Sequence, residues 1–203
     1  MKVLIFGGFL GAGKTTVIMQ MAKYMIAMDP DAMSKIVLLE NEIGENGVDD
    51  KTLAETGMKV ETLFSGCICC TMAGEMIENM CFIEKKFNPE WVILETTGMA
   101  YPSNVKKIVV DTFPKMEVHL ISLVDAKRWN RMQRIPELKD FSKEQLKGAD
   151  IILINKRDLV SEDDLSRVDI SVRQMNNTAL LIHISAKKRI NNEIWKKIFS
   201  WGI

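Results

Sequence analysis

The sequence predicts an α/β protein with a three-layer α/β/α fold and a mostly parallel sheet. Short apolar runs alternate along the chain with amphipathic stretches, as is typical of strands that helices cover on both faces. The first apolar run is followed by a glycine-rich loop and then by a helical pattern. Strands are predicted at residues 2–6, 35–40, 59–63, 91–95, 117–124, 151–154 and 180–184.

Helical periodicity and capping residues locate the helices between these strands. Ser142 with Gln145, and Ser161 with Asp164, have the spacing of N-terminal capping boxes. The acidic stretch 41–57 contains three glycines and has no period, and an irregular segment of that length in a compact domain is usually functional. Helices are predicted at residues 14–28, 74–87, 103–110, 142–147, 161–175 and 191–200.

Composition excludes several classes of protein. Lys and Arg total 27 and Asp and Glu total 27, so no excess of positive charge favours nucleic acid or an anionic membrane as a partner. Hydrophobic residues make up 47%, which argues against disorder, and no apolar run approaches the roughly 18 residues of a membrane span. The apolar start is too short for a signal peptide, so we expect a cytoplasmic protein with a single domain at residues 1–203.

The loop after the first strand matches a phosphate-binding pattern. Residues 8–15, Gly-Phe-Leu-Gly-Ala-Gly-Lys-Thr, fit GxxxxGK[ST] between a strand and a helix. The glycines let backbone N–H groups face an anion at the helix N-terminus, and Lys14 would reach the β- and γ-phosphates. The Thr15 hydroxyl would bind Mg²⁺. The predicted nucleotide ligands here are Gly8, Gly11, Ala12, Gly13, Lys14, Thr15 and Thr16.

A second motif indicates which base is bound. Residues 155–158, Asn-Lys-Arg-Asp, follow a predicted strand and fit the NKxD pattern that recognises guanine. The Asp158 carboxylate can accept from guanine N1–H and the exocyclic amine, the Lys156 stem can lie along the base, and Asn155 would brace the loop. The next such loop, Ser185, Ala186 and Lys187, resembles the one whose backbone N–H meets guanine O6. A solvated turn is the alternative for NKxD, and an ATP-dependent kinase would share the phosphate loop.

Clustered thiols predict a metal site. Cys67, Cys69 and Cys70 lie within four residues, and thiolates suit Zn²⁺, Cu⁺ and similar ions. Three protein ligands would leave a fourth position open to exchange. The alternatives are a small-residue turn and a redox pair. Cys81 lies farther on, in a predicted helix, where we expect it to pack in the core.

The chain resembles the CobW-like P-loop GTPases, relatives of the nickel-enzyme maturation GTPases UreG and HypB. Five segments carry the resemblance in order: 8–16, 41–45, 66–71, 95–98 and 155–158. The Cys-x-Cys-Cys element distinguishes the CobW-like branch. The resemblance implies GTP hydrolysis coupled to delivery of a metal ion or cofactor into a target enzyme. Longer CobW-like proteins carry a second, C-terminal domain, and because this chain departs from that pattern we expect a short form.

The resemblance also implies roles for single residues. Glu95 would contact Mg²⁺ at the end of a strand, and Thr97 and Gly98 would face the γ-phosphate, so that Lys14, Thr15, Glu95 and Gly98 form the catalytic set. Glu42 would join the three cysteines at a site for Zn²⁺, Co²⁺ or a similar ion, and Asp49 is a second carboxylate for Mg²⁺. Solvated loop charge is the alternative for Glu42 and Asp49. No glutamine stands where Ras-type proteins orient water, so slow hydrolysis is expected.

The leading hypothesis is a cytoplasmic Mg²⁺-dependent GTPase that acts as a metallochaperone or as a metallocentre or cobalamin-related assembly factor. Its partner would be a client metalloenzyme or a cofactor-assembly protein, and the resemblance also suggests a homodimer. The alternative is a GTP-gated clamp for a corrinoid or other metalloenzyme, in which the thiols hold only structural zinc.

Overall fold

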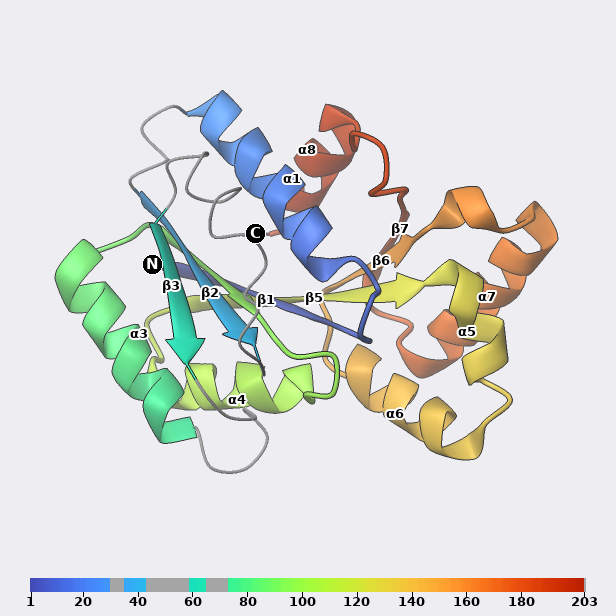
Figure 1. The fold of residues 1–203 in the computed structure, drawn as a ribbon, viewed down its shortest axis with the longest axis horizontal. Coiled ribbons are helices and arrows are strands. Elements are labelled where there is room, and N and C mark those ends of the chain that lie inside the picture. Colours follow the sequence, from blue (N-terminus) through green and yellow to red (C-terminus); the bar gives the residue numbers. More distant parts are fainter. Residues whose placement is uncertain (30–34, 43–58, 65–72, 203) are drawn as a thin grey trace.

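The computed structural model describes residues 1–29, 35–42, 59–64 and 73–202 (Figure 1). Its sheet has seven strands in the order β3-β2-β4-β1-β5-β6-β7, and each neighbouring pair is parallel. The strands are β1 (Lys2–Gly8), β2 (Ile36–Glu42), β3 (Lys59–Phe64), β4 (Trp91–Glu95), β5 (Glu117–Asp125), β6 (Ile151–Asn155) and β7 (Leu180–His183). The predicted parallel sheet is confirmed.

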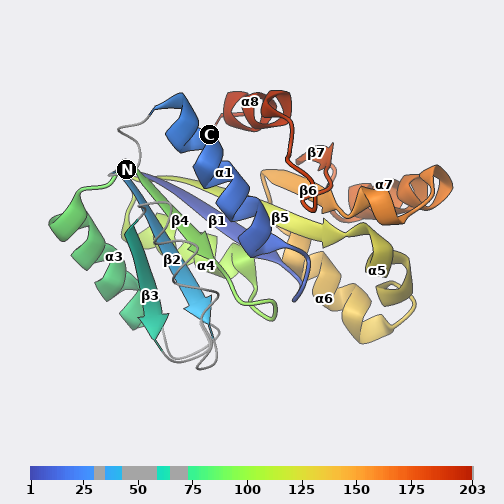
Figure 2. The ribbon, with the colours of Figure 1, turned by 45° about the horizontal axis from the view of Figure 1, so that its top comes forward.

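Helices cover both faces of the sheet, which gives the predicted three layers (Figures 1 and 2). Helices α1 and α8 lie on one face, and α3, α4, α6 and α7 lie on the other. The helices are α1 (Lys14–Met28), α3 (Ala73–Phe87), α4 (Pro102–Thr112), α5 (Ala126–Met132), α6 (Pro136–Leu146), α7 (Glu162–Met175) and α8 (Asn192–Ser200), with a 3₁₀ turn η2 (Arg157–Leu159).

The alternation of side chains along each strand divides the core between the two faces. In β1, Leu4 and Phe6 pack with Met21 of α1 and Trp195 of α8. The intervening strand residues point the other way, toward Met80 of α3, Val109 of α4 and Val168 of α7. Both faces of the central strands are therefore buried, which explains their continuous apolar sequences.

The predicted start of one helix is wrong. Ser142 lies inside α6, fully buried, and its hydroxyl donates to the carbonyl oxygen of Leu138 at 2.6 Å. The helix begins instead at Pro136, whose fixed φ and missing N–H suit a first helical position. The short helix α5 was not predicted, because two turns are too few for a clear period. The other cap is confirmed: the Ser161 hydroxyl accepts from the backbone N–H of Asp164 at 3.1 Å.

Cys81 does not belong to the core, contrary to the prediction. The buried positions of α3 are Met76, Met80 and Ile83, and Cys81 is only half-buried beside them.

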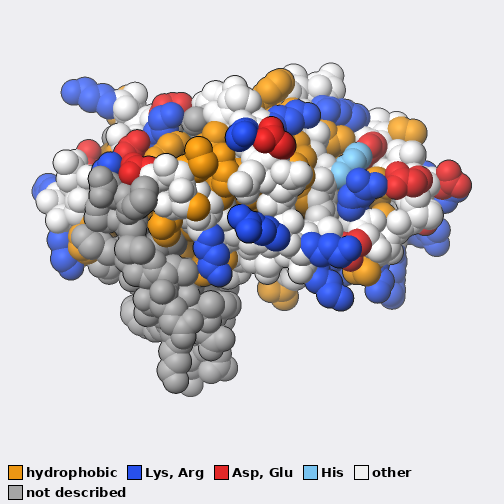
Figure 3. Space-filling view, turned by 90° about the horizontal axis from the view of Figure 1, so that it is seen from above, with side chains coloured by type: hydrophobic (Ala, Val, Ile, Leu, Met, Phe, Trp, Pro, Cys, Tyr) orange, Lys and Arg blue, Asp and Glu red, His pale blue; other side chains and the backbone are white. Residues whose placement is uncertain are grey.

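On the face seen in Figure 3, lysine and arginine side chains are spread among acidic ones, in keeping with the balanced charge. Within the described ranges, no helix is long and apolar enough to cross a membrane.

Candidate nucleotide site

The predicted nucleotide ligands come together at the carboxyl edge of the sheet. Strands β2, β3 and β4 lie on one side of β1 in the sheet, and β5, β6 and β7 lie on the other. The connections after β1 and after β4 therefore lead to opposite sides, which opens a crevice at the carboxyl end of β1, the usual ligand site in such sheets. A cleft of about 1100 Å³ lies there, lined by the phosphate loop, the segment after β4, Arg128, the segment after β6 and Ala186 with Lys187. Motifs almost 150 residues apart in sequence thus share one cleft.

The phosphate loop has a backbone that only glycine adopts easily. Gly13 precedes α1 with φ of 99°, and a Cβ at this position would lie 2.5 Å from Nδ2 of Asn155. Gly98, in the segment after β4, approaches the loop so closely that its Cβ would lie 2.4 Å from the backbone nitrogen of Leu10. The N-cap residue of α1, Gly13, has no side chain to cap the helix, so the N–H groups of the first turn can bind an anion.

The inner face of the loop carries the predicted catalytic groups. Lys14 is 6% exposed, its Nζ donates to the carbonyl oxygen of Gly8 at 3.0 Å, and burial lowers its pKa while the nearby Glu95 carboxylate opposes that shift. The Thr15 hydroxyl lies 2.9 and 3.0 Å from the two carboxylate oxygens of Glu95. The Thr97 hydroxyl oxygen is buried and has no hydrogen-bond partner among the described residues.

These residues fit a nucleotide with Mg²⁺. A hydroxyl and a carboxylate side by side supply the hard oxygen ligands that Mg²⁺ prefers. A buried ammonium and the open end of a helix favour a phosphate, and Thr97, whose hydroxyl has no partner among the described residues, is one of the residues that line the cleft. The donor set therefore suits the group that the sequence motif predicts.

At the opposite end of the cleft, the base segment is joined to two other loops. Asn155 is 2% exposed: its Nδ2 donates to the carbonyl oxygen of Ala12 at 2.8 Å, and its Oδ1 accepts from the N–H of Lys156 at 2.8 Å and of Ala186 at 2.9 Å. Lys156 adopts φ of 65°, and its Nζ donates to the carbonyl oxygen of Gly11 at 2.7 Å. Asn155 thus joins the phosphate loop, its own segment and the loop of Ala186, whereas the sequence predicted only that it braces its own loop.

Asp158 presents an ionised carboxylate to solvent at the mouth of the cleft. The Ser185 hydroxyl donates to it, which lowers the pKa of Asp158, and the charges of Lys187 and Lys188 act in the same direction. The carboxylate is therefore a pure acceptor at neutral pH, which is the state that recognition of guanine requires. A hydrogen bond from Ser185 also fixes its direction.

Three residues at the site were missed by the sequence analysis. Asp125 ends β5 and caps α5, and Arg128 reaches from α5 to the phosphate loop. Gln145 was expected at the start of a helix but lies in the last turn of α6 and is buried. Its Oε1 accepts from the N–H of Gly8 at 2.8 Å, and its Nε2 donates to the carbonyl oxygen of Ala100. The spacing of an N-terminal cap, Asp125 to Arg128, was a usable signal for the first two.

The predicted thiol site falls largely outside the described residues. Cys67, Cys69, Cys70 and Asp49 lie there, and of Glu42 the structure describes only the backbone, which ends β2 opposite Phe64 of β3. Within the ranges that are described, no group of three or more His, Cys, Asp and Glu side chains could hold a metal ion. The thiol site therefore stays a prediction.

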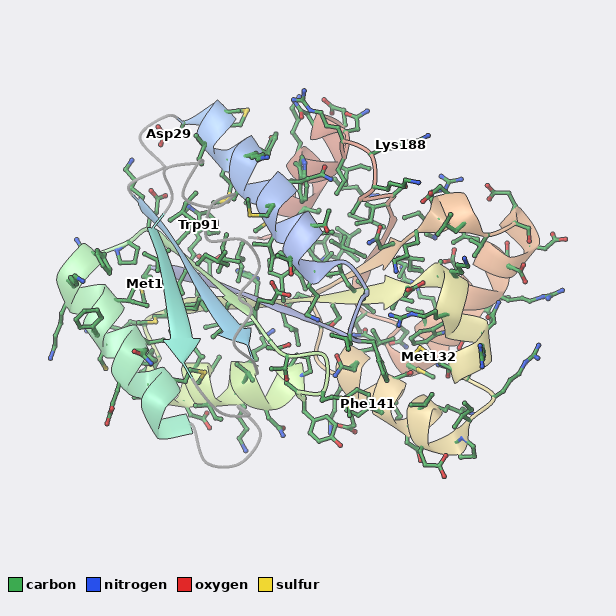
Figure 4. The ribbon with its side chains drawn as sticks, viewed as in Figure 1. Met1, Asp29, Trp91, Met132, Phe141 and Lys188 are labelled. Carbon is green, nitrogen blue, oxygen red and sulfur yellow. The ribbon has the colours of Figure 1, made fainter. Side chains whose placement is uncertain are left out.

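Aromatic side chains flank the phosphate loop beside α6. The ring of Phe9 packs edge-on against Phe141, with ring centroids 5.0 Å apart, and Phe141 in turn lies 5.5 Å from Tyr101. Phe141 belongs to α6 and is labelled in Figure 4. Leu10 and Met99 are 73% and 60% exposed at the rim of the cleft. The rim is thus apolar at the end where the γ-phosphate is expected.

The family follows from the sequence together with this geometry. The model of the CobW/HypB/UreG family, nucleotide-binding domain, matches residues 2–183. The chain belongs to this family. It is 29% identical to the zinc chaperone CobW of a Sinorhizobium species, in an alignment that covers 81% of this chain and 53% of that protein. For the zinc chaperone YjiA of Escherichia coli, the identity is 30% over 79% of this chain and 50% of that protein.

The chain thus spans about half the length of these curated relatives. Solved structures agree on the fold. The zinc-bound YjiA GTPase of E. coli has a TM-score of 0.64 at 22% identity, covering 96% of this chain and 60% of that one. The hydrogenase maturation factor HypB of Archaeoglobus fulgidus has a TM-score of 0.67 at 18% identity, covering 98% and 89%. At such low identity these structures establish the fold alone.

Proposed function

We propose that the chain binds GTP with Mg²⁺ and hydrolyses it slowly in the cytoplasm, as a metallochaperone or metallocentre-assembly factor. One observation carries the GTP assignment: Asp158, ionised and directed by Ser185, stands at the mouth of the cleft whose other end holds the phosphate loop. Guanine offers two donors to such a carboxylate. Adenine offers no matching pair, so its binding would leave the carboxylate without partners.

At the phosphate end, each side chain would act from the position it occupies. Lys14 would turn from the carbonyl of Gly8 to the β- and γ-phosphates, since its charge is buried. Thr15 and Glu95 would hold Mg²⁺ directly or through water. The metal, when bound, would neutralise charge that develops on the phosphates. Met99 follows Gly98, so a polar side chain to orient water is lacking there and slow turnover is expected.

We further propose that Cys67, Cys69 and Cys70, with Glu42, bind the transported metal. Support comes from the sheet, because β3 ends at Phe64, three residues before Cys67, and β2 ends at Glu42. The carboxyl ends of β2 and β3 lie on the same side of the sheet as Glu95, which ends β4. Strand β3 is separated from β4 by β2, so the axes of β3 and β4 are about 10 Å apart. The relatives CobW and YjiA are zinc chaperones, so Zn²⁺ is the first metal to test.

The alternative is a GTP-gated clamp on a client metalloenzyme, with zinc in a structural role. The exposed apolar rim formed by Leu10 and Met99 favours a protein partner at the nucleotide face. In that case the ion would stay bound throughout the cycle, and the nucleotide would control only the docking of the client.

Metal affinity in different nucleotide states separates the two. Zn²⁺ would be titrated against a competing chelator without nucleotide, with GDP, and with a non-hydrolysable GTP analogue, each with Mg²⁺. Delivery requires the affinity to change between states, since coupling between two ligands is reciprocal. Equal affinities in all three would overturn the carrier proposal and leave the clamp.

A pair of cysteine variants locates the ion. Cys69→Ala should abolish tight Zn²⁺ binding, and Cys81→Ala, at a half-buried position of α3, should leave it unchanged.

A competition between GTP and ATP tests the base assignment in the parent protein. Equal binding of the two would overturn it and favour a kinase.

A further inference from the structure

Three consecutive carbonyl oxygens of the phosphate loop each accept a hydrogen bond from a different side chain. Nη2 of Arg128 donates to the carbonyl of Leu10, Nζ of Lys156 to that of Gly11 at 2.7 Å, and Nδ2 of Asn155 to that of Ala12 at 2.8 Å. Peptide planes held by their carbonyls on one side present their N–H groups on the other. The N–H groups opposite these carbonyls belong to Gly11, Ala12 and Gly13, and that of Ala12 donates to the carbonyl of Phe9 at 3.0 Å. The bonds from Arg128 and Asn155 therefore fix the direction of the N–H groups of Gly11 and Gly13, which we expect to bind phosphate.

Two of the three donors depend on one buried carboxylate. Asp125 is 4% exposed, and its Oδ2 accepts from Nε of Arg128 at 2.8 Å and from Nζ of Lys156 at 2.7 Å. Its Oδ1 accepts from the backbone N–H of Arg128 at 3.2 Å. Asp125 thus links Lys156, which belongs to the base motif, to Arg128, which bonds the carbonyl of Leu10 in the phosphate loop.

We propose that Arg128 is a positioning residue for the nucleotide phosphates, and that Asp125 couples the phosphate loop to the base segment. The inference rests on the proposed binding of GTP. Arg128 acts through the loop: its planar guanidinium bonds Asp125 through Nε and Leu10 through Nη2 at the same time. A lysine, with one ammonium group, does not reproduce this fork.

The proposal predicts which nucleotides bind more weakly when Arg128 is replaced by alanine. The N–H groups of the loop serve the β- and γ-phosphates, and GMP has neither. Arg128→Ala should weaken binding of GDP and of a non-hydrolysable GTP analogue by about threefold to tenfold, as for a partly exposed charged hydrogen bond. Binding of GMP should stay within experimental error. The measured signature is thus the ratio of the GDP and GMP affinities.

Asp125→Asn should give a different pattern. This variant loosens Lys156 as well as Arg128, so it should weaken GMP and GDP together. Asp158→Asn should also lower all three affinities, because guanine is common to them. Arg128→Lys should recover less than half of the loss in binding free energy, since charge alone does not restore both bonds.

The experiment is a titration of GMP, GDP and the GTP analogue against the whole chain, with Mg²⁺. Arg131→Ala is the matched control, since Arg131 is an exposed arginine of the same helix. Thermal unfolding of each variant checks that it folds. Arg128 is 45% exposed, so its removal leaves no core cavity, and the Arg128 series holds even if Asp125→Asn fails to fold.

The outcomes separate this inference from the function on which it rests. If the parent protein binds no guanine nucleotide, the proposed function fails. If the parent binds GDP and Arg128→Ala binds it equally well, the positioning role is overturned. Equal losses for GMP and GDP in Arg128→Ala would also overturn it, because they would assign Arg128 to the base or to general stability.

Discussion

The outer and inner faces of the phosphate loop differ in how fully the protein itself pairs their polar groups. On the outer face, the carbonyls of residues 10–12 each have a side-chain donor, and the N–H of Gly8 is bound by Gln145. On the inner face, burial lowers the pKa of Lys14, and the Thr97 hydroxyl has no partner in the described part of the chain. The fold completes the outer face, whereas the inner face is arranged for a ligand at some expense of stability.

The largest expected effect concerns the inner face. Lys14→Met should lower GTP affinity on the order of 100-fold, because it removes charge-assisted bonds to two phosphates. The same variant should raise the melting temperature of the nucleotide-free protein. Since the pKa of Lys14 is lowered in the folded state, its charge costs stability in full at every pH below that folded pKa. The cost falls as the pH rises further and vanishes only above 10.5, the ordinary pKa of lysine.

Titration of nucleotide and thermal unfolding at neutral pH check both parts of this prediction. Lys23→Met is the control, since Lys23 is exposed on the same helix. A lower melting temperature for Lys14→Met than for the control would contradict the contrast between the two faces.

A substitution at the base end should have the next largest effect. Asp158→Asn should weaken GTP binding by about 10-fold to 100-fold and improve binding of the xanthine nucleotide, whose base presents an acceptor instead of the amine. In the parent protein, the pKa of Asp158 lies below its usual value, so GTP binding should not change through this group from pH 8 to pH 5. Titrations across that range test the statement, and a loss of affinity already at pH 6 would speak against it.

Asn155 tests the outer face directly. Asn155→Ala should reduce the free energy of unfolding by about 2 to 4 kcal/mol, because it leaves the carbonyl of Ala12 and the N–H of Ala186 without partners. Urea denaturation measures the change. Asn104→Ala, at an exposed position of α4, should change stability by less than about 0.5 kcal/mol. Similar losses in both variants would show that the outer face is not specially paired.

The smallest expected effect lies away from both faces. Ser161→Ala removes the cap of α7 and should cost about 1 kcal/mol of stability, with GTP affinity unchanged. The variant sets the baseline for a change that destabilises the protein without touching the cleft. A parallel loss of GTP affinity would mean that stability alone controls binding, and the distinction between the faces would then disappear.

Local patterns predicted most of the fold. Trp91–Glu95 and Lys14–Met28 were placed without error, because continuous apolar strands and an amphipathic helix each have a signal within a few residues. The phosphate and base motifs were also visible, since each is a contiguous string. The cap spacing of Asp125 and Arg128 could have located the start of α5, but the contacts that Arg128 and Gln145 make with the phosphate loop were not recognised, because those partners lie 118 and 137 residues away. A buried glutamine has no sequence signature of its own.

The bond between Gln145 and Gly8 has a consequence for the order in which the chain assembles during synthesis. The phosphate loop is among the first segments to be synthesised. The N–H of Gly8 nevertheless lacks its hydrogen-bond acceptor until residue 145 has been made, and the carbonyl of Ala12 lacks its donor until residue 155 has been made. Asn155 in turn receives its last donor from residue 186. The segment that leaves the ribosome first is therefore completed last, and tight nucleotide binding marks a chain whose sheet is already assembled.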